Sequence, residues 1–429
     1  MILRPRIALL LLLPLLAVAV GAAPQAAPPA PAPGAGDVLA LTGARILVSP
    51  EAPAIPRGVV LIAGGRIVAV GAAGRIAVPA GASVRDCTGA TLAAGFWNCH
   101  VHLIAPAVLG ADRLPPAALG GWMREHFARY GTTAVFDLGS PLANTAAIRR
   151  RIAAGEVDGP RVLTTGEPLF PPHGTPDYAV AVIRRLGIHP PEIETARQGV
   201  AAVRDRLAGG ADAIKIYAAS PIGNGKVATF LLPAARAVAA AAHAAGRLVF
   251  AHPQTAAGIE VARAAGVDVL AHTVPREAPW SAAAIAALRR RDISLIPTLR
   301  VFELEYVRMG ESPEATRAVV ARVSGQLGAY SRAGGRILFG TDCGYTGEYD
   351  DGPELALMAG AGLSFRQVLA ALTTAPAERF GTHAGRIAPG YDADLVLLEG
   401  ESDDVASLSR IRATYRAGRL LYDAAARPR

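Results

Sequence analysis

Strand-like and helix-like segments alternate regularly through the middle of this 429-residue chain. Short apolar runs are separated by Ala/Arg-rich stretches at helical spacing, such as 194–207, 231–245 and 313–333. There are eight apolar runs. One lies directly before His100, and the others are 133–138, 161–165, 213–217, 247–252, 267–272, 293–298 and 336–342. Eight such units over roughly 280 residues match a (β/α)8 TIM barrel in count and size.

The apolar character of these runs is typical of a parallel sheet that is covered on both faces. A doubly wound open sheet is the competing architecture, but no glycine-rich fingerprint follows the first run. We therefore predict an α/β chain whose residues 94–384 form a TIM barrel.

The two ends of the chain differ from the middle. Residues 37–93 and 385–425 contain short strand-like runs and Gly-containing turns, with no segment at helical spacing in the first of them. Strands from opposite ends of a chain can pair in one sheet. We predict a small β-sandwich-like domain built from both ends, into which the barrel is inserted.

The N-terminus is typical of a secretory signal. Arg4 and Arg6 precede an apolar run at 7–20, and small residues follow it. We predict a signal peptide at 1–22, an Ala/Pro-rich spacer at 23–36, and export to the periplasm or the extracellular space. A retained signal-anchor is the alternative, although the apolar run is short for a membrane span.

Charge and cysteine content limit the partners. The net charge is +8, but the arginines are scattered and no block of like charges occurs, so we expect a small-molecule substrate and no nucleic acid. We also expect no stable membrane association after signal removal, and the pattern does not predict an oligomeric state. The chain has three cysteines, so at least one thiol stays unpaired. We therefore expect that disulfides do not organise this fold.

Polar residues stand at the predicted strand ends, which is where barrel enzymes place their chemistry. His100 and His102 share one face of their strand because side chains alternate, so both are predicted to face the barrel interior and Cys99 the outside. The same alternation turns Lys215 and Tyr217 inward. The complete set at this rim is His100, His102, Lys215, His252, His272 and Asp342.

One such histidine is more often a packed core residue than a ligand. The set is more informative, since it takes four of the nine histidines and one of only two lysines, the other being Lys226. Imidazole and carboxylate ligands suit Zn²⁺ best, with Mn²⁺, Fe²⁺ or Co²⁺ as alternatives. We predict one or two divalent metal ions at this rim.

Lys215 is a special case, because an ammonium group is repelled and desolvated beside a divalent cation. Burial lowers the pKa of a lysine and yields a neutral, nucleophilic amine. Such an amine can capture CO₂ as an anionic carbamate, and a carboxylated Lys215 could bridge two metals. The alternative is an ion pair with a buried carboxylate.

With these residues the chain resembles the amidohydrolase superfamily. The segments that carry the resemblance are 95–102, 210–216, His252, His272, 340–342 and 390–398. The likeness spans nearly all of 37–425, and it is closest to the branch with imidazolonepropionase-like and Xaa-Pro dipeptidase (prolidase)-like members. Asn98 departs from the pattern, since the family often has Asp there.

The resemblance implies roles for the rim residues. His100, His102 and Asp342 would hold the first metal, His252 and His272 the second, and carboxylated Lys215 would bridge them. A water activated by the ions would attack the substrate, and Asp342 would be the catalytic base that passes the proton to the leaving group. Deaminase-like chemistry is disfavoured, because residues 253–255 supply no acid.

Substrate-binding residues are expected on the loops that follow the strands. His173 resembles a substrate-contacting histidine of the prolidase-like branch, Tyr217 could orient a carbonyl, and Arg300 could bind a carboxylate; ordinary packing roles are the alternative for each. The predicted function is hydrolysis of the C–N bond of an amide, cyclic amide or dipeptide-like substrate. The alternatives are a lactone or ester hydrolase and a non-catalytic binding protein.

Overall fold

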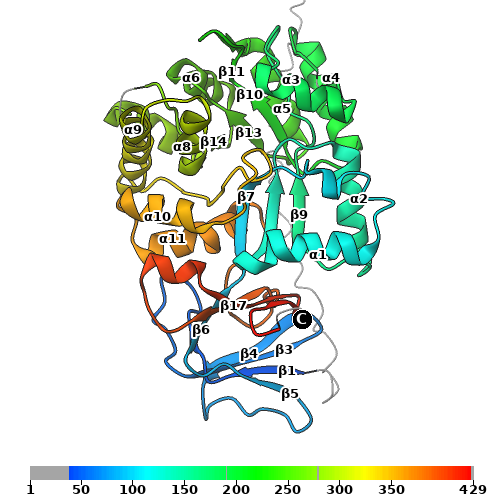
Figure 1. Ribbon diagram of the computed structural model, residues 1–429, viewed down its shortest axis with the longest axis vertical. Helices are drawn as coiled ribbons and strands as arrows, with labels where there is room; N and C mark the ends of the chain where they lie inside the picture. The colour runs from blue at the N-terminus through cyan, green and yellow to red at the C-terminus, as the bar shows by residue number, and fades with distance from the viewer. Residues whose placement is uncertain (1–37, 190, 278–279, 427–429) are drawn as a thin grey trace, which may run out of the picture.

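A computed structural model describes residues 38–189, 191–277 and 280–426, and the chain is α/β (Figure 1). The predicted signal peptide and spacer lie outside the described residues. Among the helices that are described, none is both long and apolar enough to cross a membrane.

Parallel strands form the centre of the larger, upper part of the molecule (Figure 1). One three-stranded sheet has the order β7-β8-β9, and one four-stranded sheet has the order β10-β13-β14-β15. All of their pairs are parallel, as predicted from the apolar runs. The strands are β7 (Phe96–Val101), β8 (Thr132–Asp137), β9 (Arg161–Thr164), β10 (Ile214–Tyr217), β13 (Val249–His252), β14 (Val269–Ala271) and β15 (Ser294–Ile296).

Backbone hydrogen bonds link the two parallel sheets on both sides. On one side, Leu169 N donates to Lys215 O at 2.8 Å, joining the chain after β9 to β10. On the other side, the chain after residue 336 bonds to both β15 and β7, since Leu338 N donates to Leu295 O and Cys99 N to Phe339 O. The fold is TIM-barrel-like, and a single closed sheet of eight strands stays a prediction.

The prediction of a regular strand over 336–342 is wrong. Within the described chain this stretch forms only isolated bridges, Ile337 with Leu295 and Cys343 with Val101. Gly340 lies so close to β7 that a Cβ there would be 3.0 Å from the backbone N of His100. Asp342 adopts a φ of 57°, which is outside the extended region and ends the ladder.

Helices cover the outside of the parallel sheets (Figure 1). Alanine lets them pack closely, as in α5, where Ala234, Ala235, Val238, Ala239 and Ala242 form one buried face. The helices are α1 (Pro116–His126), α2 (Leu142–Ala153), α3 (Asp177–Leu186), α4 (Ala196–Ala208), α5 (Leu232–Ala244), α6 (Ala256–Ala265), α7 (Ala282–Arg290), α8 (Leu299–Arg308), α9 (Pro313–Arg332), α10 (Gly352–Gly360), α11 (Phe365–Leu372) and α12 (Thr374–Arg379). A hairpin of β11 (Ala219–Pro221) and β12 (Val227–Thr229) follows β10.

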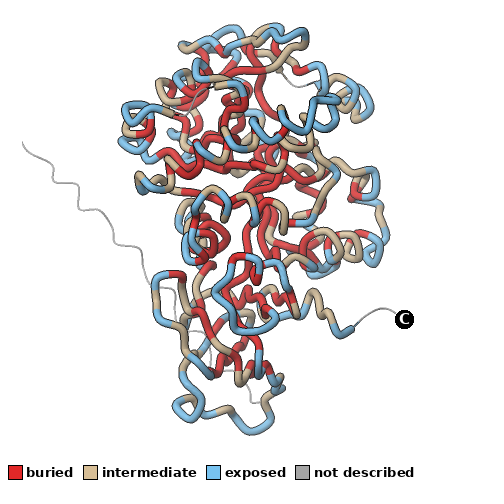
Figure 2. The backbone as a smooth tube through the Cα atoms, turned by 60° about the vertical axis from the view of Figure 1, so that its left-hand side comes forward, coloured by how far each residue is buried: buried red, intermediate tan, exposed pale blue. Residues whose placement is uncertain are grey.

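Two layers of apolar side chains hold this part together, and the buried tube in Figure 2 passes through its centre. One layer lies between strands and helices and includes Ile214, Ile216 and Val238. The other is drawn from the strands and includes Trp97, Cys99, Phe136, Phe250 and Leu338.

Cys99 therefore packs with the side chains that the strands enclose, and the prediction that it faces outward is wrong. The register of β7 against β8 shifts between Asn98 and Val101. Such an irregularity breaks the simple alternation of side chains. Cys99 is not a member of the three-residue cluster described below.

The lower part of the molecule holds two further sheets, with orders β4-β3-β1-β5 and β18-β17-β16-β6-β2 (Figure 1). Strands from the two ends of the chain pair directly, since β16 lies antiparallel to β6. One apolar cluster, including Leu41, Val60, Leu92 and Leu395, draws on both sheets. The strands are β1 (Leu39–Thr42), β2 (Arg45–Ile46), β3 (Gly58–Ala63), β4 (Arg66–Ala72), β5 (Ser83–Asp86), β6 (Ala90–Ala94), β16 (Leu395–Glu399), β17 (Ile411–Arg416) and β18 (Arg419–Asp423). The domain boundaries at 94 and 384 stay a prediction.

Candidate functional site

Three of the predicted ligands form one cluster. Nε2 of His102 lies 2.8 Å and Nε2 of His100 3.3 Å from Oδ1 of Asp342. One ligand atom from each of the three lies within 4.8 Å of the others. Backbone hydrogen bonds fix this arrangement, because Asp342 N donates to His100 O and His102 N to Cys343 O. The end of β7 and the bend at Asp342 thus hold the cluster.

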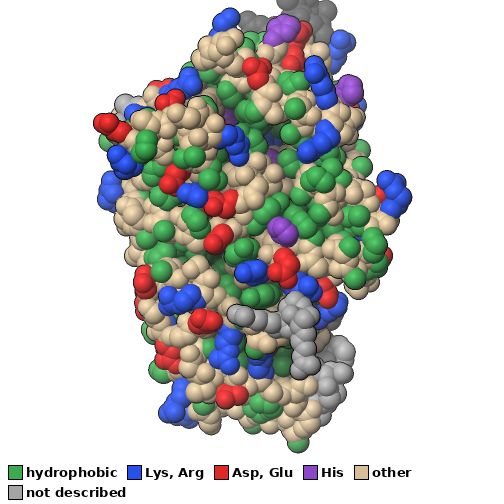
Figure 3. Space-filling model, viewed as in Figure 1, with side chains coloured by type: hydrophobic (Ala, Val, Ile, Leu, Met, Phe, Trp, Pro, Cys, Tyr) green, Lys and Arg blue, Asp and Glu red, His purple; other side chains and the backbone are tan. Residues whose placement is uncertain are grey.

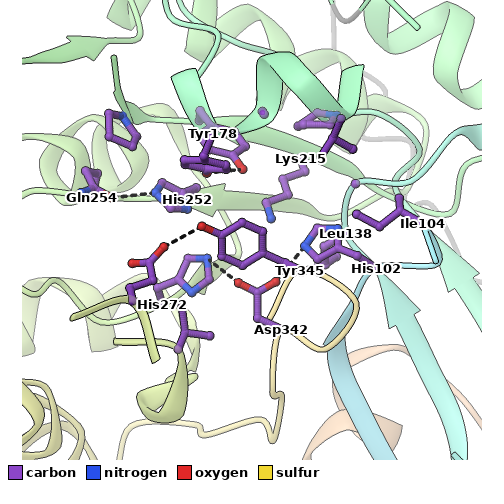
Figure 4. Close-up of a pocket in the computed structure, with 18 of the residues that line it drawn as sticks. His102, Ile104, Leu138, Tyr178, Lys215, His252, Gln254, His272, Asp342 and Tyr345 are labelled. Carbon is purple, nitrogen blue, oxygen red and sulfur yellow. Dashed lines mark hydrogen bonds and ion pairs between the residues drawn. The ribbon is translucent and has the colours of Figure 1, made fainter. Parts of the chain in front are cut away.

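The other three predicted residues surround this cluster (Figure 4). Nζ of Lys215 lies 3.3 Å from Nε2 of His100. Nε2 of His272 lies 3.9 Å from Oδ2 of Asp342, and the His272 ring is 4.7 Å from the His252 ring between centroids. Strands that are far apart in the sequence therefore bring all six side chains to one place.

Burial decides the charge of the imidazoles. It lowers the pKa of His252 to about 4, with a further contribution from Lys215, and it holds the pKa of His100 and His272 well below the ordinary value. These rings are uncharged near neutral pH, and their nitrogen lone pairs are available to a cation.

Asp342 carries the negative charge. Its burial alone would raise the pKa, but the neighbouring imidazoles, His100 foremost, hold the pKa of Asp342 well below its usual value. Burial also lowers the pKa of Lys215 to about 8, against the opposing effect of Asp342. No carboxylate of the described chain forms an ion pair with Lys215. The alternative of a buried ion pair is therefore not what the structure has.

This donor set fits divalent metal ions. Neutral imidazoles and a carboxylate are the ligands that Zn²⁺ and neighbouring transition metals take. Nδ1 of His100 is buried and has no hydrogen-bond partner among the described residues, and buried Oδ1 of Asp342 has the imidazoles of His100 and His102 beside it. Buried polar atoms without partners are costly, and a bound cation is one way to satisfy a carboxylate in such a place.

His252 shows one further requirement for metal binding. Its Nε2 lies 2.9 Å from Oε1 of Gln254, and its ring stacks on that of Tyr217 at 4.5 Å. A metal ligated through Nε2 would have to displace this amide. Gln254 adopts a φ of 51°, so its backbone is held in an uncommon conformation beside the site.

Asn98 supports the site from behind. Its Nδ2 donates to Thr341 Oγ1 at 2.8 Å, and its Oδ1 accepts from the backbone N of Thr341 and of His100. Asn98 thus joins β7 to the residue before Asp342, in agreement with a role in orienting the ligands.

Helix α8 supports His272 from the other side. Nδ1 of His272 lies 2.6 Å from Oγ1 of Thr298, which precedes α8 and has a φ of 44°. The Thr298 side chain does not cap the helix; instead the buried carboxylate of Glu354 accepts from the backbone N of Leu299 and Arg300. Glu354 therefore caps α8 from a distant part of the sequence.

Glu354 makes stability depend on pH. Burial raises the pKa of this carboxyl from 4.5 to about 7. The folded protein then holds the proton more tightly than the unfolded chain, so a contribution on the order of 2–3 kcal/mol is present below about pH 4.5 and is lost as pH rises through about 7. Glu354→Gln cannot ionise. We expect the melting temperature of wild type, relative to Glu354→Gln, to fall by a few degrees between pH 5 and pH 8. A difference that stays constant across this range would contradict the assignment.

Of the three predicted substrate-binding residues, only one lines the cavity at this site. Tyr217 lines a cavity of about 400 Å³ together with Lys215, His252, His272 and Asp342. His173 is exposed and is not among the residues that line this cavity; its backbone N donates to Glu192. Arg300 also lies outside the lining, because Glu303 and Glu348 bind its guanidinium. The structure therefore brings Tyr217 to the site and does not bring His173 or Arg300.

Four residues at the cavity were missed by the sequence analysis. Tyr178 contacts the hydroxyl of Tyr217 at 3.2 Å, Tyr345 donates to Glu305 at 2.7 Å, and Gln254 holds His252. Gln254 follows a predicted ligand by two residues, which is a usable signal. Tyr178, Glu305 and Tyr345 lie in loops or loop helices, and no local spacing points to them.

The sequence profile of the Amidohydrolase family matches residues 91–421, which is most of the chain. The chain belongs to the amidohydrolase family. A search of curated proteins gives no match. Solved structures do match this amidohydrolase, and the resemblance predicted from the rim residues is confirmed.

The structural neighbours are prolidase-like. A candidate prolidase from Bifidobacterium longum is 26% identical, with a TM-score of 0.75, over 90% of this chain and 94% of that one. A prolidase complexed with N-methylphosphonate-L-proline is 26% identical, with a TM-score of 0.74, over 90% and 100%. A Xaa-Pro dipeptidase with bound methionine is 22% identical, with a TM-score of 0.76, over 90% and 100%, and shows the fold alone. Family and neighbours together support a hydrolase that acts on C–N bonds, in a family that typically uses divalent metals.

Proposed function

We propose that this amidohydrolase uses two divalent metal ions, with Zn²⁺ the best match, to cleave the C–N bond of an amide, cyclic amide or dipeptide-like substrate. The observation that carries the proposal is the convergence of His100, His102 and Asp342 within 4.8 Å, beside a buried lysine. Family membership supports the same reaction class.

The residues fit a binuclear arrangement. His100, His102 and Asp342 would hold one ion, and His252 and His272 the other. With a pKa of about 8, part of the Lys215 amine is neutral near neutral pH. This neutral form would add to CO₂, forming an N–C bond with release of a proton, and the resulting carbamate would lie between the two ions. When bound, the ions would polarise the substrate carbonyl and lower the pKa of a water molecule.

The protein's own groups move the proton. Asp342, held ionised by its neighbours, accepts a proton from the attacking water and delivers it to the leaving nitrogen, which departs as an amine. Tyr217 stays protonated because burial raises the pKa of its hydroxyl, so it can donate a hydrogen bond to the carbonyl oxygen. The other product is a carboxylic acid, which ionises to a carboxylate by releasing its proton to the amine or to solvent.

A substrate panel tests the reaction class. Metal-replete protein should hydrolyse Xaa-Pro dipeptides and N-acyl amino acids, and a chelator should remove that activity. A matched set of lactones and aryl esters is the comparison. Faster turnover of the esters at every matched pair would replace the amide assignment with an ester hydrolase, and no turnover of either set by metal-replete protein would favour a binding protein.

We propose further that the protein is exported and acts on a small molecule. The support is the sequence of residues 1–22. N-terminal sequencing of the protein recovered outside the cytoplasm should begin near residue 23; an intact Met1 would contradict signal removal.

A further inference from the structure

Helix α3 presents an apolar face to the cavity. Ala179, Val182, Ile183 and Leu186 recur at helical spacing and all line it. The opposite side of α3 carries Ala181, Arg184 and Arg185, which are exposed. None of the ten residues of α3 is fully buried. Helix α5, for example, buries its apolar face in the protein, whereas α3 presents its apolar face to the cavity.

Helix α8 forms the facing wall. Val301, Phe302 and Met309, the last just beyond the helix, line the same cavity. We call the space between these residues and the apolar face of α3 the α3–α8 cleft. Figure 3 shows hydrophobic side chains gathered around the hollow in the upper half of the molecule. Tyr178 and Met309, large apolar side chains of this region, are 40% and 60% exposed.

The polar groups of the cavity lie at the strand ends and on the α8 side, and not on the apolar face of α3. All of the predicted ligands except His100 line it at the strand ends, together with Tyr217. Glu305, which is bonded to Tyr345, and the arginines Arg276 and Arg308 line it as well. From α3, only Tyr178 and the four apolar residues line the cavity, so a substituent that lies against this helix meets no charged side chain of it. Each buried CH₂ group contributes about 0.8 kcal/mol when it leaves water, so this wall favours a matching apolar group.

We propose that the α3–α8 cleft binds a bulky alkyl or aryl substituent of the substrate, which makes hydrophobic amides the preferred class. The inference rests on the proposed function for the position of the scissile bond. The apolar face of α3 is the specificity determinant, and charged or small polar substituents gain nothing from it.

The test separates binding from hydrolysis. Primary alcohols from butan-1-ol to octan-1-ol are the probes, and their dissociation constants are measured by ligand-observed NMR on the full-length protein. Affinity is expected to rise about two- to fourfold per methylene group. Ile183→Asn and Leu186→Asn should each flatten this rise. Ala181→Asn, with the same new side chain on the exposed face of α3, should keep it.

The outcomes identify which proposal fails. If the alcohol series shows no chain-length dependence, or if Ala181→Asn flattens it as much as Ile183→Asn does, the cleft proposal is wrong. The KM values of N-acyl amino acids should fall with acyl length in wild type and not in Leu186→Asn; equal slopes would also overturn it. Chain-length dependence of alcohol binding without any amide hydrolysis would instead refute the proposed function and leave the cleft standing.

Discussion

Replacing Asp342 with asparagine is expected to lower kcat/KM on the best amide of the substrate panel by about three orders of magnitude or more. Asparagine keeps the shape of the side chain but cannot take up a proton, and general acid–base groups typically contribute about 10²–10⁴ in rate. The variant also loses the charge that the neighbouring imidazoles stabilise at this position.

The control is a second buried aspartate. Asp394 is 3% exposed, accepts a hydrogen bond from the backbone N of Ala417, and lies in the lower sheets away from the cavity lining. Asp394→Asn should retain activity close to that of wild type. Thermal unfolding of both variants shows whether they fold. A folded Asp342→Asn enzyme with activity within tenfold of wild type would remove Asp342 from its catalytic role.

Replacing Lys215 with alanine is expected to lower activity by about two orders of magnitude or more, because it removes the bridge that we propose between two ions. Its side chain is 1% exposed, and its amine contacts His100. A carbamate is a carboxylate-like anion, so added acetate or propionate should enter the space that alanine leaves and restore part of the activity.

Lys226 provides the matched control, as the other lysine of the chain and an exposed one near the β11–β12 hairpin. Lys226→Ala should behave like wild type with and without acetate. If Lys215→Ala loses activity but no short carboxylate restores it, the lysine acts as an amine and not as a carbamate. Full activity in Lys215→Ala would show that neither form is needed.

The convergence of the rim residues was predictable because strand geometry is regular. Side chains alternate along a strand, and parallel strands end at one rim, so Lys215 and His252 were placed from local pattern alone. Where the backbone is irregular, alternation no longer predicts strand ends or side-chain orientation. Cys99 packs with Trp97 among the enclosed side chains next to a register shift in β7, and the positive φ of Asp342 ended a predicted strand while leaving its carboxylate at the site.

Loop residues were less predictable, because their positions depend on contacts between distant segments. Arg300 was a reasonable carboxylate ligand from its place after a strand, yet Glu348, which lies far along the chain, binds its guanidinium. Tyr345 and Glu305 meet across the cavity only once the whole fold has formed. Loop chemistry of this kind follows from tertiary structure and not from spacing.

If these side chains form a centre for divalent metal ions, the purified protein must retain metal. Protein loaded with Zn²⁺ and freed of excess should retain about two equivalents per chain by elemental analysis, and a His252→Asn, His272→Asn double variant about one. Wild-type protein that folds normally yet retains no metal after loading would rule out a metal centre at these residues.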